Sequence, residues 1–345
     1  MATLQVTFKD LREEVQRYLG YGRETPYGGG GALSASNRGD VLVCIERGLR
    51  QFYNPAPLPN ESSSHEWSFL RGEGVIATVA PHTDSTIDSI SGTTVEGNSG
   101  TNFTSAMVGR LLHVNNEIRE ITAFTDADTI TIDRALETAI SADSTVSYEI
   151  IANKYSLPAD FGGLKGNVTY RDGDGYTQLK FINESAIRML RSQGTILTEV
   201  PEYFSIVPTA VSNETTSAQA FELTIWPFPD KVYDLNFSYT VLPNSLGDDA
   251  DSTGYDNNVP VGGMIHGETI MASCLTIAEQ MVDEFNNPGK MQARYNDRLM
   301  ASISYDRRNM LPDGFGYNGD NSDRRLEVPT RRRLQTVTYR DTLYP

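Results

Sequence analysis

Residues 264–309 read MIHGETIMASCLTIAEQMVDEFNNPGKMQARYNDRLMASISYDRRN and contain two apolar repeats with helical spacing. The first repeat consists of Met271, Leu275, Ala278, Val282 and Phe285, and the second of Met291, Tyr295, Leu299 and Ile303. Steps of three or four residues place these side chains on one face of a helix. Residues 286–289, NNPG, interrupt the pattern. The stretch therefore predicts a helical hairpin with helices over 264–286 and 290–309.

A second helical pair is predicted at the start of the chain. Thr7 and Asp10 have the spacing of an imperfect capping box, and Gly20 stands where the first helix stops. The second helix has an apolar stripe that runs from Val41 to Phe52 and precedes two prolines. We expect helices over about 7–20 and 36–53.

Between the two helical pairs the sequence is typical of β-structure. Residues 74–151 are rich in Thr, Ser, Asp, Val and Ile, and their short apolar runs at 110–114, 117–121, 129–132 and 146–150 are separated by turn residues. Such runs predict a small sandwich or barrel, which we interpret as an insertion. Further strands are expected at these positions: 65–70, 168–170, 176–181, 203–207, 221–226 and 233–241. A short helix is expected near 184–191.

The predicted fold class is α+β, with a helical-hairpin core, an inserted β-module, a second antiparallel β region and an extended arm. The expected segments are a helical pair with a first strand (1–72), the inserted module (73–152), the antiparallel β region (153–262), the helical hairpin (263–310) and the arm (311–345).

Composition and charge exclude several classes of protein. The chain has 345 residues, a net charge of −16 and two cysteines. Two cysteines cannot build a disulfide framework, and the four histidines share no metal-ligand spacing. An acidic surface repels phosphates, so general nucleic-acid binding is not expected. The sequence contains no long apolar run, so we expect neither a signal peptide nor a membrane span.

No catalytic motif is complete in this sequence. Residues 97–100, GNSG, resemble the nucleophile turn of a serine protease, with His65, His82 and Asp84 upstream. We interpret Ser99 as part of a polar turn. We therefore expect no enzymatic site and no cofactor.

The candidate metal sites are also incomplete. Residues 172–175, DGDG, are followed by Tyr176 where a calcium loop needs an oxygen ligand, and predict a tight turn instead. Asp249 and Asp251 begin a loop that resembles half of an EF-hand, but Pro260 stands at position twelve. A solvated acidic loop over 248–256 is expected, and cation binding there stays an open alternative. Cys44 and Cys274 are predicted to pack in the core.

The C-terminal arm departs from the acidic character of the chain. Residues 324–345 contain six arginines against Glu327 and Asp341, a net charge of +4. We interpret the segment as an arm that docks on an acidic surface of another protein. The expected docking side chains are Arg324, Arg325, Arg331, Arg332, Arg333, Arg340 and Tyr344. A solvated tail and a DNA-binding tail are the alternatives.

Three parts of the sequence together resemble the head-to-tail connectors, or neck adaptors, of tailed bacteriophages. The first is residues 45–53, IERGLRQFY, followed by 67–70, WSFL. The second is residues 155–161, YSLPADF, followed by 168–170, VTY. The third is the late helical pair with its basic tail. The resemblance covers about 1–72 and 153–345, and the module over 74–151 is a departure from it.

The resemblance implies a structural virion protein, assembled in the host cytoplasm, at the head–tail junction. It implies a homo-oligomeric ring, commonly of twelve subunits, whose helical part packs against neighbours. The ring would contact the portal protein through the arm and a further neck or tail protein below. Genomic DNA would pass through the channel as cargo, and an acidic wall would keep phosphates from adhering.

Other functions remain open at this point. A tail terminator, tail tube or baseplate protein is one alternative. Another is a carbohydrate-binding or hydrolytic protein that uses Trp67 and Trp226 as a sugar platform. A cytoplasmic scaffold is the third.

Overall fold

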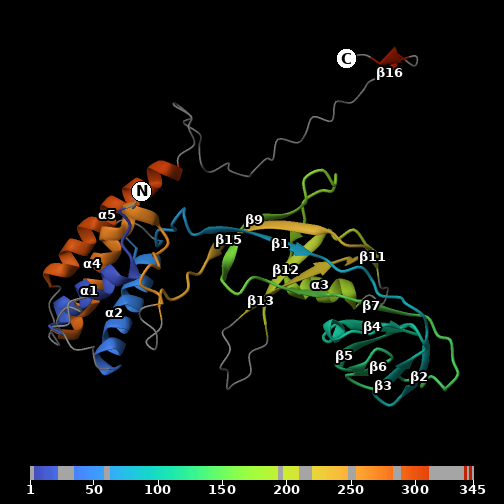
Figure 1. Cartoon of the computed structure of the whole chain (residues 1–345). Helices are drawn as coiled ribbons and strands as arrows, with labels where there is room; N and C mark the ends of the chain where they lie inside the picture. The colour runs from blue at the N-terminus through green and yellow to red at the C-terminus, as the bar shows by residue number, and fades with distance from the viewer. Residues whose placement is uncertain are drawn as a thin grey trace.

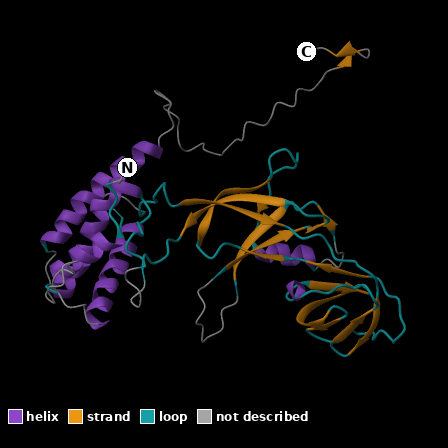
Figure 2. Cartoon of the chain, viewed as in Figure 1, coloured by secondary structure: helices purple, strands orange, loops and turns teal. Residues whose placement is uncertain are grey.

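The computed structural model has an α+β fold, as expected, with a helical body at one end, a β-sandwich in the middle and a small β-barrel at the other end (Figures 1 and 2). The structure describes residues 4–21, 35–57, 63–192, 197–209, 220–247, 254–282, 289–310, 338–339 and 342–343. Within these ranges, no helix combines the length and the apolar character that a membrane span requires.

Four long helices make the helical body: α1 (Phe8–Leu19), α2 (Ala35–Tyr53), α4 (Gly263–Val282) and α5 (Lys290–Met310). These bounds agree closely with the expected helices, except that residues 283–286 lie outside the described part of the chain. The four helices share one hydrophobic core, and α4 contacts each of the other three. The first and last parts of the sequence therefore fold together.

The start of α1 is fixed by the capping box that the sequence predicts. Thr7 Oγ1 accepts a hydrogen bond from the Asp10 backbone N–H at 3.2 Å, and Asp10 Oδ2 accepts one from the Thr7 N–H at 2.9 Å. Gly20 ends the helix in the left-handed region with φ 77°. Each end of the helix thus satisfies backbone groups that lack partners within it.

Helix α2 crosses α4 at Gly48. A Cβ atom at this position would lie 2.6 Å from the Cα of Cys274, closer than real contacts allow. Ser273 Oγ donates to the Gly48 carbonyl at 2.8 Å across the same crossing. The missing side chain therefore lets the two helix backbones approach.

Residues 65–70 do not form the predicted strand. Trp67 and Leu70 instead pack into the core of the helical body, and the Leu70 N–H donates to the Trp67 carbonyl in a turn. The alternating apolar pattern here reflects contact with helices and not with a sheet. The strand, β1 (Arg71–Ala77), begins directly afterwards.

Two layers form the β-sandwich, and their strands pair antiparallel except that β10 runs parallel to β12. One sheet has the order β1-β15-β9, with β15 at Asp234–Val241 and β9 at Phe161–Tyr170. The other has the order β10-β12-β13-β8, with strands Lys180–Phe181, Tyr203–Pro208, Phe221–Trp226 and Lys154–Ser156. Their inward side chains form one hydrophobic core.

Strand β1 belongs to this sandwich, which corrects the expected start of the inserted module at residue 73. It pairs along its whole length with β15, including Gly72 with Tyr239 and Gly74 with Phe237. The two aromatic rings occupy the space that side chains at the glycines would fill. Aromatic cross-strand partners of this kind cover glycines in edge strands.

The region around the sandwich contains several shorter elements. Helix α3 (Glu184–Arg191) matches the expected short helix. Residues 176–179 are not a strand, and only β10 remains of the strand expected over 176–181. Phe228–Pro229, between the strands expected at 221–226 and 233–241, forms β14, which pairs with β11 (Thr198–Glu199).

A six-stranded sheet with the order β2-β3-β6-β5-β4-β7 makes the barrel. Its strands are Ile87–Ser91, Thr94–Gly97, Thr129–Ile132, Glu117–Asp126, Leu111–Val114 and Tyr148–Ile151. A 3₁₀ turn, Ser105–Met107, lies against it. The Ile87 N–H donates to Val146 O at 2.9 Å, and the Ile90 N–H donates to Ile140 O at 3.0 Å. These bonds join β2 to the segment that leads into β7, and the His82 N–H donates to Ile150 O of β7 at 2.9 Å, so the sheet closes around its own core.

The crossing at Gly48 gives a stability prediction. We expect Gly48→Ala to lower the free energy of unfolding by about 1–3 kcal/mol, because the added methyl forces α2 away from α4. Chemical denaturation measures the change. Arg47→Ala, on the exposed side of the same helix, is the control and should change stability little. Equal stability of both variants would contradict the close helix contact.

Candidate functional site

The side chains predicted to dock on a partner lie beyond α5. Arg324, Arg325, Arg331, Arg332, Arg333, Arg340 and Tyr344 are all outside the described residues. Of this arm, the structure describes β16 (Thr338–Tyr339) and β17 (Thr342–Leu343), which pair antiparallel. The docking role of the arm stays a prediction.

The helix that leads into the arm is itself basic. Five basic side chains are exposed along α5: Lys290, Arg294, Arg298, Arg307 and Arg308. Asp297 is the one exposed acidic residue of this helix, since Asp306 is buried. The positive charge that the sequence analysis assigned to residues 324–345 thus begins on a folded helix.

The most elaborate polar cluster of the helical body surrounds the Asp306 carboxylate, which is 2% exposed. Its Oδ2 accepts from His65 Nε2 at 2.9 Å and from the Ser68 N–H at 3.1 Å, and its Oδ1 accepts from the Ser68 hydroxyl. These bonds fasten residues 65–68 to the last turns of α5. The C-terminal end of α5 therefore lies beside the segment that leads into the β-sandwich.

Aromatic rings enclose this cluster. Trp67 lies edge-on to His65 at 4.9 Å and to His266 at 5.2 Å, and its Nε1 donates to the Phe52 carbonyl at 2.8 Å. The sequence gave no indication that His65 and His266 both lie against Trp67, because the two histidines are about two hundred residues apart. Among the described residues, no three or more His, Cys, Asp or Glu side chains are grouped so that they could hold a metal ion.

Two groups of the cluster have shifted pKa values. Burial raises the pKa of Asp306, but the Ser68 hydroxyl, the Ser68 N–H and His65 outweigh it, and the net pKa is lowered. Burial lowers the pKa of His266, despite the opposing effect of Asp306. Both groups bind fewer protons in the folded state than in the unfolded chain, so acid destabilises this end of the helical body.

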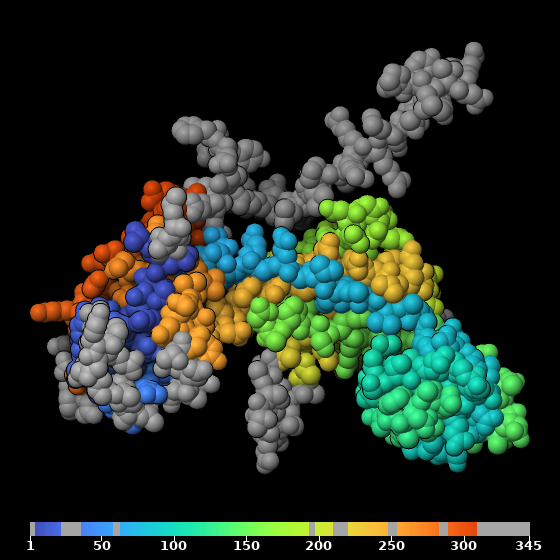
Figure 3. All heavy atoms as spheres, viewed as in Figure 1, coloured from blue at the N-terminus to red at the C-terminus, as the bar shows by residue number. Residues whose placement is uncertain are grey.

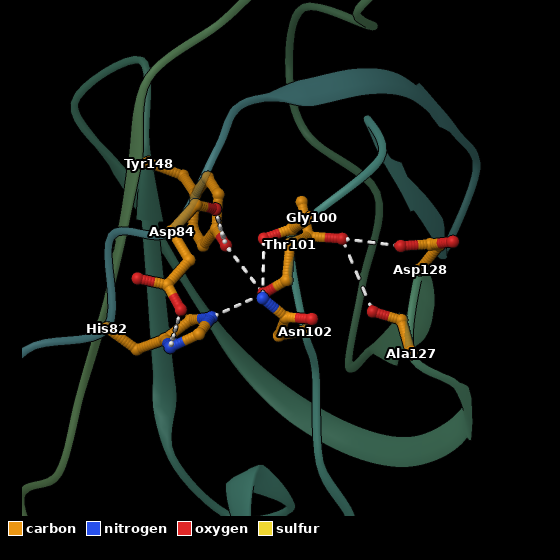
Figure 4. A network of polar contacts seen from close by, with 8 residues as sticks. All are labelled: His82, Asp84, Gly100, Thr101, Asn102, Ala127, Asp128 and Tyr148. Atoms are coloured by element: carbon orange, nitrogen blue, oxygen red, sulfur yellow. Dashed lines mark hydrogen bonds and ion pairs between the residues drawn. The ribbon is translucent and has the colours of Figure 1, made fainter.

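The residues that resemble a serine-protease site do not form one (Figure 4). His82 Nδ1 lies 3.8 Å from Asp84 Oδ2, but His82 Nε2 lies 2.6 Å from the Thr101 carbonyl oxygen. A carbonyl only accepts, so Nε2 carries the hydrogen and cannot take a proton from a serine. Ser99 uses its carbonyl to accept from Ser85 Oγ at 3.0 Å. His82 therefore serves the barrel as a hydrogen-bond donor.

The other candidate residues that the structure describes lie in a tight turn or in the hydrophobic core. Gly173 and Gly175 adopt positive φ angles of 99° and 75°, as a tight turn requires. Asp249 and Asp251 lie outside the described residues. Cys44 and Cys274 are buried, and burial raises the pKa of the Cys44 thiol to about 11. Neither turn nor thiol supplies a reactive group among the residues the structure describes.

The aromatic platform of a sugar-binding protein is not assembled from the two tryptophans. Trp67 is 5% exposed and Trp226 is 7% exposed, and they belong to different hydrophobic clusters. Both side chains therefore pack in cores, which favours the structural interpretation over the carbohydrate-binding one.

A cavity of about 1130 Å³ lies beside the barrel and the end of α3. Two of the three arginines that line it already bind the protein itself. Arg119 forms an ion pair with Glu117 and donates to the Ile118 carbonyl, and Arg191 donates to the Asn153 and Ile225 carbonyls at 3.3 and 3.0 Å. These contacts tie α3 to the sandwich.

The Asp306 cluster gives a prediction that depends on pH. We expect Asp306→Asn to lower the free energy of unfolding by about 2 kcal/mol at pH 7, because three hydrogen bonds to a charged acceptor are weakened. The folded-state pKa is depressed, so this stabilisation is present above the unfolded-state pKa of about 3.9 and is lost as pH falls through the lower folded value. Denaturation at pH 7 and at pH 3 measures the difference.

Asp297→Asn, on the exposed face of the same helix, is the control and should be neutral at both pH values. A penalty for Asp306→Asn that did not shrink in acid would show that the charge of the carboxylate is irrelevant.

Comparison with known proteins identifies the family. The profile of the family described as "SU10 adaptor protein" matches residues 98–314, which is more than half of the chain. The match begins inside the barrel, after β2 and β3, and runs through the sandwich to the end of α5, so it includes the larger part of the module that the sequence alone set apart from the resemblance. No curated protein matches the sequence. The chain therefore belongs to the SU10 adaptor protein family.

Proposed function

We propose that this chain is the subunit of a head-to-tail connector, a homo-oligomeric ring beneath the portal through which genomic DNA passes. Family membership carries the proposal, because it makes the chain a structural phage adaptor and a virion component. The ring, its twelve copies, its position at the neck and its contact with a further tail protein are the parts that we add. The helical hairpins would supply its core, and the helical body would pack against neighbouring copies.

The charge distribution supports passage of DNA without binding. Residues 79–152, which include the barrel, contain three basic and eleven acidic side chains, a net charge of −8. Half of the net charge of −16 is thus concentrated in one module. A phosphate backbone is repelled by such a surface, and a conduit for DNA needs low adhesion.

The positive charge of α5 and of residues 324–345 supports a docking function for this part of the chain. The exposed basic side chains of α5 support the same docking function as the six arginines of residues 324–345, because α5 directly precedes the arm in the sequence. Arginine pairs well with carboxylates, and clustered charge steers encounters with an acidic partner. The Asp306 cluster would hold the root of the arm in a fixed place while the arm reaches the portal.

Deletion of residues 324–345 tests this function. We expect the truncated protein to remain folded, because the helical body, sandwich and barrel have their cores within residues 4–310. We expect attachment to portal rings to fall at least tenfold, measured by co-sedimentation at low and moderate salt. Attachment of the full chain should weaken as salt rises, since ions screen charges over about 8–10 Å.

A matched variant in which the six arginines are changed to lysine tests whether attachment to the portal depends on charge alone or also on the geometry of the guanidinium groups. It should retain part of the attachment, because lysine keeps the charge but loses the paired hydrogen bonds. Undiminished attachment of the truncated chain would contradict the docking arm. Strong binding of the isolated arm to duplex DNA would favour the nucleic-acid alternative.

A further inference from the structure

The edge of the sandwich at β1 is open. The Thr78 N–H donates to Tyr233 O at 2.8 Å and the Val241 N–H donates to Leu70 O at 2.9 Å, which sets the even-numbered residues of β1 toward β15. Backbone groups alternate in an antiparallel pair. The N–H and C=O groups of residues 71, 73, 75 and 77 therefore point away from β15, and β1 has no second strand partner among the described residues.

This edge lacks two of the devices that usually protect one, a proline and a bulge. Residues 71–77, RGEGVIA, contain no proline, and the pairing with β15 runs without a bulge. Val75 is 65% exposed, and the light-blue band that includes β1 lies on the visible surface between the helical body and the barrel (Figure 3). A regular, unprotected edge of this length is a template for another strand.

The opposite edge of the same sheet is open over part of its length. The C-terminal half of β9 is covered, because the Leu179 N–H donates to Val168 O at 3.0 Å. Over residues 161–165, β9 pairs with β15 and with no second strand of the described chain. Both β1 and β9 run antiparallel to β15, so they run parallel to each other.

The two edges carry opposite charges at the same level of the sheet. Ser238 of β15 pairs with Glu73 on one side and with Lys165 on the other, so these three residues form one row across the sheet. Ile76 and Leu164 pack on the core, so alternation places Glu73 and Lys165 together on the outer face. Lys165 contacts Glu66 of its own chain, a carboxylate whose side chain is 72% exposed. Exposed pairs of this kind are weak, so the lysine can be shared.

We propose that β1 of one copy pairs in parallel with the N-terminal half of β9 of a second copy, with Glu73 beside Lys165 of that copy. The inference rests on the proposed ring and names one of its contacts. Two different edges of one sheet form a heterologous contact, which closes when the rotation between copies completes a circle. Repeated around a ring, the contact covers the β1 edge and the open part of the β9 edge in every copy.

Proline at an outward-facing position tests the backbone contact. Val75→Pro removes one N–H that points away from β15 and keeps the bonds to β15, as edge strands tolerate. We expect the concentration needed for ring assembly to rise about tenfold or more, measured by native mass spectrometry and light scattering. Val75→Thr keeps the N–H and the branched side chain, and should assemble like the unaltered chain. Thermal unfolding of the isolated subunit confirms that both variants fold.

A charge exchange tests the pairing of the edges. Glu73→Lys and Lys165→Glu should each weaken assembly, because each places like charges side by side. The double variant should recover most of the loss. Assembly of Val75→Pro and of both single charge variants at the unaltered concentration would overturn the proposed contact.

The assembly measurements also distinguish a failure of this strand contact from a failure of the proposed function on which it rests. Rings formed by the unaltered chain but also by every edge variant would refute the strand contact and leave the connector function intact. An unaltered chain that stays monomeric, alone and with portal rings present, would refute the ring itself.

Discussion

Helix α4 cannot exist as a surface helix. Every residue from Thr269 to Thr276 is buried, so its whole circumference must be covered by protein. The cover comes from α1 and α2, which precede it by more than two hundred residues, and from α5 directly after it. The helical body therefore forms only when the two ends of the sequence meet. The sandwich and the barrel lie between those ends, and the chain must leave and re-enter the helical body around them.

That constraint explains the position of the polar cluster at Asp306. Residues 65–70 connect the helical body to the β-sandwich, and Asp306 lies in the last turns of α5. The Asp306 carboxylate joins these two segments through its hydrogen bonds to His65 and Ser68. A buried carboxylate with three donors requires accurate placement of its partners, since each lost bond leaves charge uncompensated. The cluster thus fixes the last turns of α5 relative to the segment that leads into β1.

The surface is divided by charge in a way that suits the proposed connecting function. The barrel region holds half of the net negative charge, and the exposed face of α5 is positive. Among the described residues, His82, which resembled part of an enzymatic site, instead holds the fold by donating to a backbone carbonyl.

Local chemistry was enough to determine the helices from the sequence. The capping box at Thr7, the stop at Gly20 and the apolar spacing in residues 264–309 act between near neighbours, so periodicity revealed them. The closely spaced short runs between 110 and 150 likewise indicated a small β-unit. Only the tertiary structure decided what covers each element. Residues 65–70 alternate like a strand, but Trp67 and Leu70 pack on helices. Residues 73–77 resemble the inserted module, but they pair with β15 some 160 residues away. His65, His266 and Asp306 meet only after folding, because long-range contacts depend on how whole elements pack and leave no periodic signal in the chain.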